Sequence, residues 1–153
     1  MSRAPMPGPP HKPLIALVDR ANRVLQAEMV RACHEAGFRE VKQAHNAVFS
    51  TLSVTRGNHT ADLAARAGIT RQSMGEIVRD LMGLGIVEMT VDPEDRRAKR
   101  VTYTGYGLEV ARAGRQHLAD LEERYAEEFG GEEYAQVRDV LARIVELLEP
   151  GER

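Results

Sequence analysis

The 153-residue chain contains no tryptophan, few other aromatic side chains and only one cysteine. A single cysteine, Cys33, excludes an internal disulfide and fits a reducing compartment. No apolar run approaches the length of a membrane-spanning helix, and the amino terminus lacks a signal-peptide core, so we expect a cytoplasmic protein that does not enter a membrane. The scarcity of aromatic residues is typical of a helical protein rich in alanine and leucine.

Charge is unevenly distributed along the chain, although the formal net charge is only −2. Residues 1–55 carry a net charge of +3, residues 56–103 carry +1 and residues 104–153 carry −6. A protein whose acidic residues collect at one end can still bind a polyanion through its middle. The balance therefore argues against non-specific coating of DNA and favours a focused contact.

Two short helical patterns meet at Gly68 and predict a helix-turn-helix. In the first pattern, Leu63, Ala64 and Ala67 lie on one face. Gly68 can adopt the left-handed conformation that ends a helix, and Thr70 can cap the next one. The second helix should bury the apolar residues Met74, Ile77, Val78, Leu81 and Leu84. It leaves a polar face outside, formed by Arg71, Gln72, Ser73, Glu76 and Arg79.

A β-hairpin is predicted directly after this helix-turn-helix. Residues 86–91 are rich in β-branched side chains, residues 92–95 form a turn cluster, and residues 100–103 alternate as a return strand. The loop carries four cations, Arg96, Arg97, Lys99 and Arg100. This arrangement is typical of a winged helix, in which the second helix reads base edges in the major groove and the hairpin tip enters the minor groove. The alternative is a charged hairpin edge that only prevents aggregation.

A resemblance to a known family is carried by two segments, ITRQSMGEIVRDLMGLGIVEM and DPEDRRAKRVTYT, and by Gly107. Over about residues 60–107 the chain resembles the multiple antibiotic resistance regulator (MarR) family of bacterial repressors. The resemblance implies that Arg97 enters the minor groove, steadied by Asp95, and that residues 70–73 lie at the major-groove end of the recognition helix. The expected DNA-binding residues are therefore Thr70, Arg71, Gln72, Ser73, Glu76, Arg79, Asp95, Arg96 and Arg97. Gly75 departs from the family pattern, where serine is usual, and so does Glu76, where arginine is usual. Glu76 can accept a hydrogen bond from a cytosine amino group or repel phosphate.

The rest of the chain predicts a mainly α (α+β) protein with helices on both sides of the winged domain. Residues 1–12, with four prolines, should be a disordered tail. We expect a dimerisation helix at 13–36, a winged helix-turn-helix domain with a two-stranded β-wing at 37–104, and C-terminal dimerisation helices at 105–153. Within these ranges, helices should span residues 39–53, 105–129 and 133–149, and Thr104 should cap the second of them. The outer helices either fold back on the winged domain or pack against a second chain. We favour the second chain, because helix-turn-helix proteins commonly bind two half-sites as symmetric dimers.

Family resemblance also implies a small phenolic or other aromatic effector, bound where the dimerisation helices meet the winged domain. That junction should draw on His34, His45 and Phe49, for which ordinary interior packing is the alternative. Cys33 is either a peroxide-sensing thiol, as in one branch of the family, or a small, partly buried helix residue. The histidines lack the spacing of metal ligands, and no nucleotide-binding motif is present, so we expect neither a metal nor a cofactor.

These observations predict a homodimeric transcriptional regulator, a repressor, that binds double-stranded DNA at a palindromic operator. Two other classes stay open. A winged helix can serve only in protein–protein contact, with the basic loop meeting an acidic partner. A small enzyme is disfavoured, because the sequence does not assemble a nucleophile, a base and an oxyanion hole.

Overall fold

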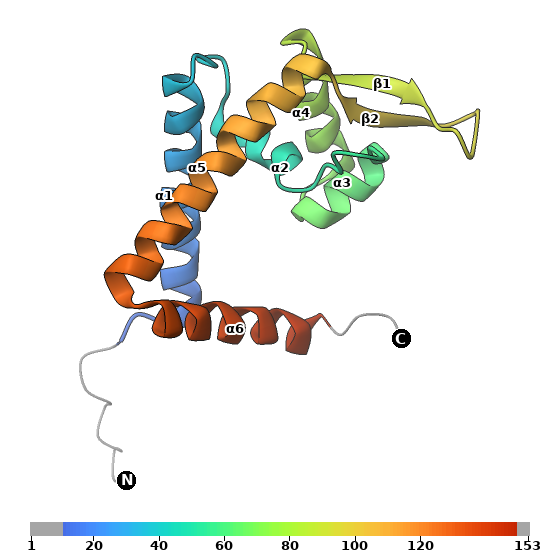
Figure 1. The fold of residues 1–153 in the computed structure, drawn as a ribbon. Coiled ribbons are helices and arrows are strands. Elements are labelled where there is room, and N and C mark those ends of the chain that lie inside the picture. The colour runs from blue at the N-terminus through green and yellow to red at the C-terminus, as the bar shows by residue number, and fades with distance from the viewer. Residues whose placement is uncertain (1–10, 150–153) are drawn as a thin grey trace, which may run out of the picture.

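The computed structural model of the protein describes residues 11–149, so the disordered tail expected at residues 1–12 lies almost entirely outside the described residues. Within that range the chain forms six α-helices, one 3-10 turn and a two-stranded antiparallel sheet (Figure 1). In chain order these are α1 (Leu14–Glu35), η1 (Gln43–His45), α2 (Asn46–Phe49), α3 (Thr60–Ala67), α4 (Arg71–Gly83), β1 (Val87–Val91), β2 (Lys99–Tyr103), α5 (Gly105–Phe129) and α6 (Gly131–Leu148). The mainly α class with a two-stranded wing is confirmed.

The elements form two parts that are joined by α5 (Figure 1). Helices α2, α3 and α4 pack with the base of the hairpin around a core that includes Val48, Leu63, Met74, Leu81 and Val101. The second part consists of α1, the distal half of α5, and α6, which crosses the far end of α5. Because α5 runs without a break from the hairpin to α6, it belongs to both parts.

The helix-turn-helix forms as the sequence predicts. Leu63 and Ala64 of α3 are buried, and Gly68 ends the helix with a φ of 67° and a ψ of 29°. Thr70 then caps α4, since its Oγ1 accepts a hydrogen bond from the Ser73 backbone N–H at 3.1 Å. The inward side chains of α4 are fully or partly buried, which leaves the opposite face of this helix exposed to solvent.

The hairpin has a neighbour that the sequence did not reveal. β1 and β2 pair antiparallel, with Val87 opposite Tyr103. On the other side of β2, Asn58 and Val101 exchange two backbone hydrogen bonds, of 3.1 and 2.8 Å. Gly57 permits this approach: its φ is 65°, and a Cβ there would lie 2.4 Å from the Val101 carbonyl oxygen. The segment before α3 is therefore joined to the base of the wing.

The helix expected over residues 39–53 is wrong in extent, because only residues 43–49 are helical. The backbone N–H of Lys42 donates to His45 Nδ1 at 3.0 Å, which starts the segment as a tight 3-10 turn. At the other end, the hydroxyls of Ser50 and Thr51 donate to carbonyl oxygens four residues earlier, at 2.7 and 2.6 Å. Such bonds compete with continuation of the helix. As a result Ala44 is exposed and His45 is buried.

The long helix expected after the wing is confirmed, with one shift at its far end. Thr104 caps α5 as expected, since its Oγ1 accepts a hydrogen bond from the Gly107 N–H at 2.9 Å. Gly130, with a φ of 89°, separates α5 from α6. Gly131 is already helical, so α6 begins two residues earlier than the sequence indicated.

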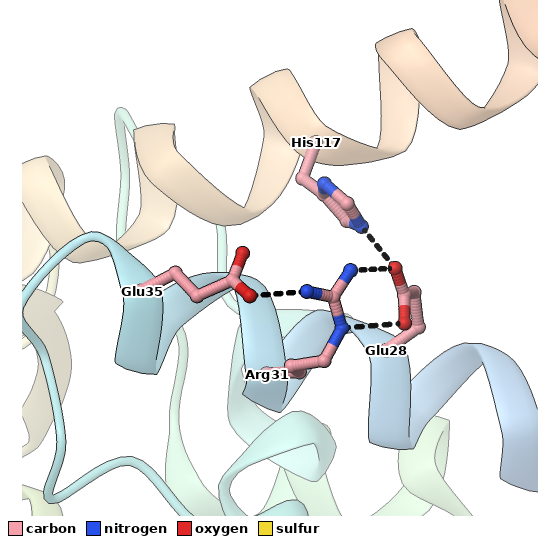
Figure 2. A network of polar contacts seen from close by, with 4 residues as sticks. All are labelled: Glu28, Arg31, Glu35 and His117. Atoms are coloured by element: carbon pink, nitrogen blue, oxygen red, sulfur yellow. Dashed lines mark hydrogen bonds and ion pairs between the residues drawn. The ribbon is translucent and has the colours of Figure 1, made fainter.

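Helices α1 and α5 approach each other closely at Gly114, where an added Cβ would lie 2.9 Å from a methionine methyl group of α1. Beside this crossing a polar network joins the two helices (Figure 2). His117 Nε2 of α5 lies 3.1 Å from Glu28 Oε1 of α1, and Arg31 bridges Glu28 and Glu35. The hydrogen bond from Arg31 lowers the pKa of Glu28 to about 2. We call these four residues the α1–α5 brace, because they hold α1 in register along α5.

Large apolar side chains remain exposed on α1 and α6. They include Leu14, Ile15, Leu17, Val18 and Val24 of α1, and Val137, Val140, Val145, Leu147 and Leu148 of α6. Leu147 is 78% exposed. An amphipathic helix needs a partner for its apolar stripe, and a contiguous apolar patch on a protein surface commonly marks an interaction site. None of the helices described between residues 11 and 149 combines the length and apolarity of a membrane span.

Candidate DNA-binding surface and effector cavity

The outer face of α4 presents most of the side chains expected to contact DNA. All six residues expected on this helix and its cap are exposed, namely Thr70, Arg71, Gln72, Ser73, Glu76 and Arg79. Thr70 and Ser73 are also bonded to each other, since Thr70 Oγ1 donates to Ser73 Oγ at 2.9 Å. These two hydroxyls are therefore already engaged in the N-terminal cap of α4. The arginines, Gln72 and Glu76 extend from one surface of a rigid helix, as direct reading of base edges requires.

The tip of the wing carries the second group of expected contact residues. Asp95, Arg96 and Arg97 are exposed in the loop between β1 and β2, which projects from the body of the molecule (Figure 1). Asp95 Oδ1 accepts a hydrogen bond from the Arg97 backbone N–H at 3.0 Å, and the Asp95 carbonyl accepts one from Ala98 at 2.9 Å. Asp95 thus contacts the backbone of Arg97 and shapes the turn. The bond is to the backbone N–H and not to the guanidinium, so it fixes the turn that carries Arg97 and does not hold the Arg97 side chain as expected.

Arg100 is not at the wing tip with the other three cations. Its Nε lies 2.8 Å from Oδ2 of Asp92, a carboxylate that is only 2% exposed and directly follows β1 at the start of the hairpin loop. The same oxygen lies 2.6 Å from His59 Nε2, and Asp92 Oδ1 accepts the Glu94 N–H at 2.9 Å. The hydrogen bonds from Arg100, Glu94 and His59 hold the pKa of Asp92 well below its usual range.

We call Asp92, Arg100 and His59 the wing clamp, because they fasten the hairpin to the residue that precedes α3. Sequence reasoning missed this cluster. A detectable signal was the position of Asp92 and Arg100 at the two ends of the same hairpin loop, which brings opposite charges together once the strands pair. His59 lies far from both in sequence, and no local pattern indicates its role.

A cavity of about 250 Å³ lies at the junction of α1, α2 and α5. Its walls are largely apolar and include Leu25, Met29, Phe49, Val110 and Leu118, while its polar groups come from Asn22, Gln26, Asn46, Ser50 and Arg115. Phe49 also stacks on Tyr103 of β2, with 6.3 Å between the ring centroids. Burial raises the pKa of Tyr103 to about 12, so its hydroxyl stays protonated. A mostly apolar pocket with a few converging polar groups is the usual form of a small-molecule site.

Only one of the three residues expected at an effector site lines this cavity. Phe49 does, whereas His34 and His45 do not. His34 is exposed, and its Nε2 donates to the Val41 carbonyl oxygen at 2.8 Å, which ties the end of α1 to the following loop. His45 is 1% exposed and faces away from the cavity toward Asp80 of α4, with 2.7 Å between Nε2 and Oδ2. Neither ring is directed to this cavity, because each is engaged in a link between elements.

Cys33 lies in the cavity wall and is only 6% exposed. Burial raises the pKa of its thiol, so the thiolate, which is the reactive form, is disfavoured at neutral pH. This environment favours the interpretation of Cys33 as a packing residue over the peroxide-sensing alternative. Among residues 11–149, no cluster of three His, Cys, Asp or Glu side chains is arranged to hold a metal ion.

A helix-turn-helix followed by a hairpin with exposed arginines defines a protein of the winged-helix class. The sequence matches no family model and no curated protein. Solved structures do match, over most of the chain. CouR from Rhodococcus jostii RHA1, bound to p-coumaroyl-CoA, is 22% identical with a TM-score of 0.69, covering 90% of this chain and 92% of that chain.

Two further structures agree. The transcriptional repressor CouR bound to a 23-mer DNA duplex is 21% identical, with a TM-score of 0.67 over 86% of this chain and 91% of that one. MarR from E. coli in its apo form is 17% identical, with a TM-score of 0.69 over 88% and 98%. The chain therefore has the fold of the MarR-family transcriptional regulators, and the resemblance seen in the sequence is confirmed at the level of the fold.

Proposed function

We propose that the protein is a cytoplasmic transcriptional repressor that binds a palindromic operator as a homodimer. The observation that carries this proposal is the pairing of two exposed surfaces on one domain: the polar face of α4 and the arginines at the wing tip. A structurally similar repressor, CouR, has been solved on a DNA duplex. The two surfaces suit the two grooves of DNA, because α4 fits the major groove and a hairpin tip fits the minor groove.

The wing tip and α4 should recognise DNA in different ways. Arg97 at the wing tip reads the shape of a narrow A·T-rich minor groove, where negative potential is concentrated. Arg71 and Gln72 at the start of α4 read base edges directly, since arginine suits guanine and glutamine suits adenine. Arg79, Arg96 and Glu76 complete the surface. Glu76 can accept from a cytosine amino group, provided its charge is kept away from phosphate.

The exposed apolar faces of α1 and α6 support assembly as a homodimer. Both belong to the part of the molecule that is distant from the wing (Figure 1). A two-fold axis through that part would place two copies of α4 side by side, and symmetric proteins of this kind bind symmetric half-sites. The palindromic form of the operator follows from this symmetry.

The cavity between α1, α2 and α5 is the proposed site of a small aromatic effector. Its volume is about 250 Å³, whereas an engineered protein cavity of about 150 Å³ already binds benzene. Arg115 and three amide side chains in the walls suit a carboxylate or a phenol on such a ring. An effector releases DNA only by binding more tightly to a dimer whose recognition helices are misspaced.

The test is a DNA-binding titration with duplexes from the region flanking the protein's own coding sequence, complemented by selection from a random duplex pool. Arg97→Ala should weaken binding, lower the dependence of log affinity on log salt by roughly one per half-site, and reduce the preference for A·T at the flanks. Arg71→Ala or Gln72→Ala should cost about 1–3 kcal/mol and relax the preference at one or two base pairs. Arg124→Ala, an exposed arginine of α5, is the control for loss of one positive charge.

The alternative is a winged-helix module that binds an acidic protein partner. The DNA-binding titration and duplex selection also distinguish this protein-binding function from the repressor function. If the wild-type dimer selects no duplex from the pool at moderate salt, the repressor proposal is wrong. If it selects a duplex but Arg97→Ala leaves affinity and salt dependence unchanged, the wing is only a charged hairpin edge, and the repressor reads DNA through α4 alone.

A further inference from the structure

One short segment, residues 43–49, has contacts with both the cavity and the recognition helix. From its one side Asn46 and Phe49 contribute to the cavity wall, together with Ser50 just beyond it. From its other side His45 reaches Asp80 of α4. In Figure 1 this segment lies between α5 and the helix-turn-helix. A bound molecule that displaces the cavity wall would therefore also displace His45, which contacts Asp80 of α4.

His45 joins the segment to α4 through hydrogen bonds at both ring nitrogens, and not through packing alone. Its Nδ1 accepts the Lys42 backbone N–H at 3.0 Å, so Nδ1 carries no proton in this bond. Nε2 is then the protonated nitrogen and donates to Asp80 Oδ2 at 2.7 Å. The ring itself is 1% exposed, so its two nitrogens are not open to bulk water. The hydrogen bond from His45 is the largest cause of a lowered pKa at Asp80, and Lys42 Nζ lies 3.2 Å from the same oxygen.

Asp80 is well placed to set the orientation of α4. It follows Arg79 directly and lies one turn after Glu76, both of which belong to the proposed DNA surface. The carboxylate is 44% exposed, so it is not needed to fill the core. A half-exposed acidic side chain close to a DNA-binding surface would be expected to repel phosphate. Its presence is explained if it serves to hold α4.

We propose that the His45–Asp80 hydrogen bond is the link by which occupation of the cavity changes the position of the recognition helix. His45 and Asp80 act as positioning residues: neither touches DNA or effector. The inference rests on the proposed function, and it adds the route of regulation within this chain. Because coupling between two sites is reciprocal, DNA binding through α4 should equally disfavour occupation of the cavity.

The first test compares two variants that remove the same charge. Asp80→Asn keeps an oxygen that can accept from His45 Nε2, whereas Asp80→Ala does not. Removal of a negative charge near DNA should by itself tighten binding in both variants. We expect Asp80→Asn to bind a selected duplex as tightly as wild type or more tightly, and Asp80→Ala to bind about tenfold more weakly. Equal affinities of the two variants would overturn the proposal.

The second test replaces the unknown effector by a side chain that fills the cavity. Ala111 of α5 lines the cavity, and Ala111→Leu places three more carbon atoms there. It should weaken DNA binding in the wild-type background and have no further effect in the Asp80→Ala background, which is a double-mutant cycle. Ser50→Leu provides a second filling variant if Ala111→Leu fails to fold as a dimer. Circular dichroism and sedimentation establish that each variant is folded and dimeric.

The outcomes separate this inference from the proposed function. If wild type selects no duplex, the proposed function fails and the link has nothing to regulate. If wild type binds DNA and the losses of Ala111→Leu and Asp80→Ala add, the cavity acts on DNA binding by another contact, such as the Phe49–Tyr103 stack, and the link is overturned. If neither filling variant changes DNA affinity, occupation of the cavity does not reach α4, which also overturns it.

Discussion

Gly107 is the position at which a single methyl group should do the most damage to the junction between the wing and α5. A Cβ at this residue would lie 1.8 Å from the Ile86 carbonyl oxygen, although real Cβ contacts essentially never fall below 3.0 Å. The neighbour is backbone, so it cannot rotate away as a flexible side chain would. The Ile86 oxygen also accepts the Thr104 N–H at 3.1 Å. Gly107→Ala must therefore push α5 away from Ile86, the residue before β1, and stretch this hydrogen bond.

The cost can be set from these contacts. Overpacking of a rigid site costs about 1–3 kcal/mol, and loss of one hydrogen bond costs about 1 kcal/mol. We expect Gly107→Ala to lower the free energy of unfolding by about 2–4 kcal/mol, a large part of the roughly 5–15 kcal/mol of a typical domain. Gly105, two residues earlier in the same helix, is the matched control, because a Cβ there meets no atom within 4 Å. Gly105→Ala should be neutral or stabilising by up to about 1 kcal/mol.

Urea unfolding followed by circular dichroism measures both variants. It must be done at one protomer concentration, since the stability of a dimer depends on it. If Gly107→Ala falls within about 0.5 kcal/mol of wild type, the close contact between α5 and Ile86 does not exist in solution. If both variants lose stability equally, the cause is the helix start in general and not the contact with Ile86.

Four further predictions follow from single residues. Glu28 has a depressed pKa, so its stabilising contribution is present above about pH 4.3 and is lost as the pH falls toward 2; Glu28→Gln should flatten the acid side of the stability profile in a pH-dependent melting series. Asp92→Asn should speed amide hydrogen exchange across the hairpin while leaving exchange in α6 unchanged. Cys33 should react with a thiol reagent far more slowly in the native protein than in urea; loss of DNA binding on peroxide treatment, abolished by Cys33→Ser, would instead establish the thiol sensor. Leu147→Glu should convert the proposed dimer to monomer in sedimentation equilibrium, and an unchanged dimer would show that α6 lies outside the interface.

The parts of the fold that the sequence predicted well are those with a strong local signal. The turn at Gly68, the Thr70 cap and the inward face of α4 follow from one residue's conformational freedom and from regular apolar spacing. The hairpin strands were found because β-branched residues flank a Pro-containing turn. Each of these features is decided within about a dozen residues, and tertiary contacts do not override it.

The features that were missed depend on contacts between distant segments. His45 looked like a candidate effector ligand, but Asp80, which is 35 positions later, decides what its ring does. Arg100 looked like a wing-tip cation until pairing of the strands brought it to Asp92. The bridge between Asn58 and Val101 likewise spans most of the winged domain. Periodicity carries no information about such pairs, so these three contacts could be found only in the structure.

Helix α5 has the mechanical property of a lever, since a single rigid rod links the base of the wing to the exposed helices at the other end. Its 25 residues span about 37 Å at a rise of 1.5 Å per residue. A tilt of about 5° at the α6 end would displace the wing base by roughly 3 Å, close to the ~3.4 Å separation of successive base pairs. The α1–α5 brace resists this tilt near the middle of the rod (Figure 2). Substitutions in the brace, far from the proposed DNA-binding surface and outside the cavity, should therefore change the preferred number of base pairs between half-sites.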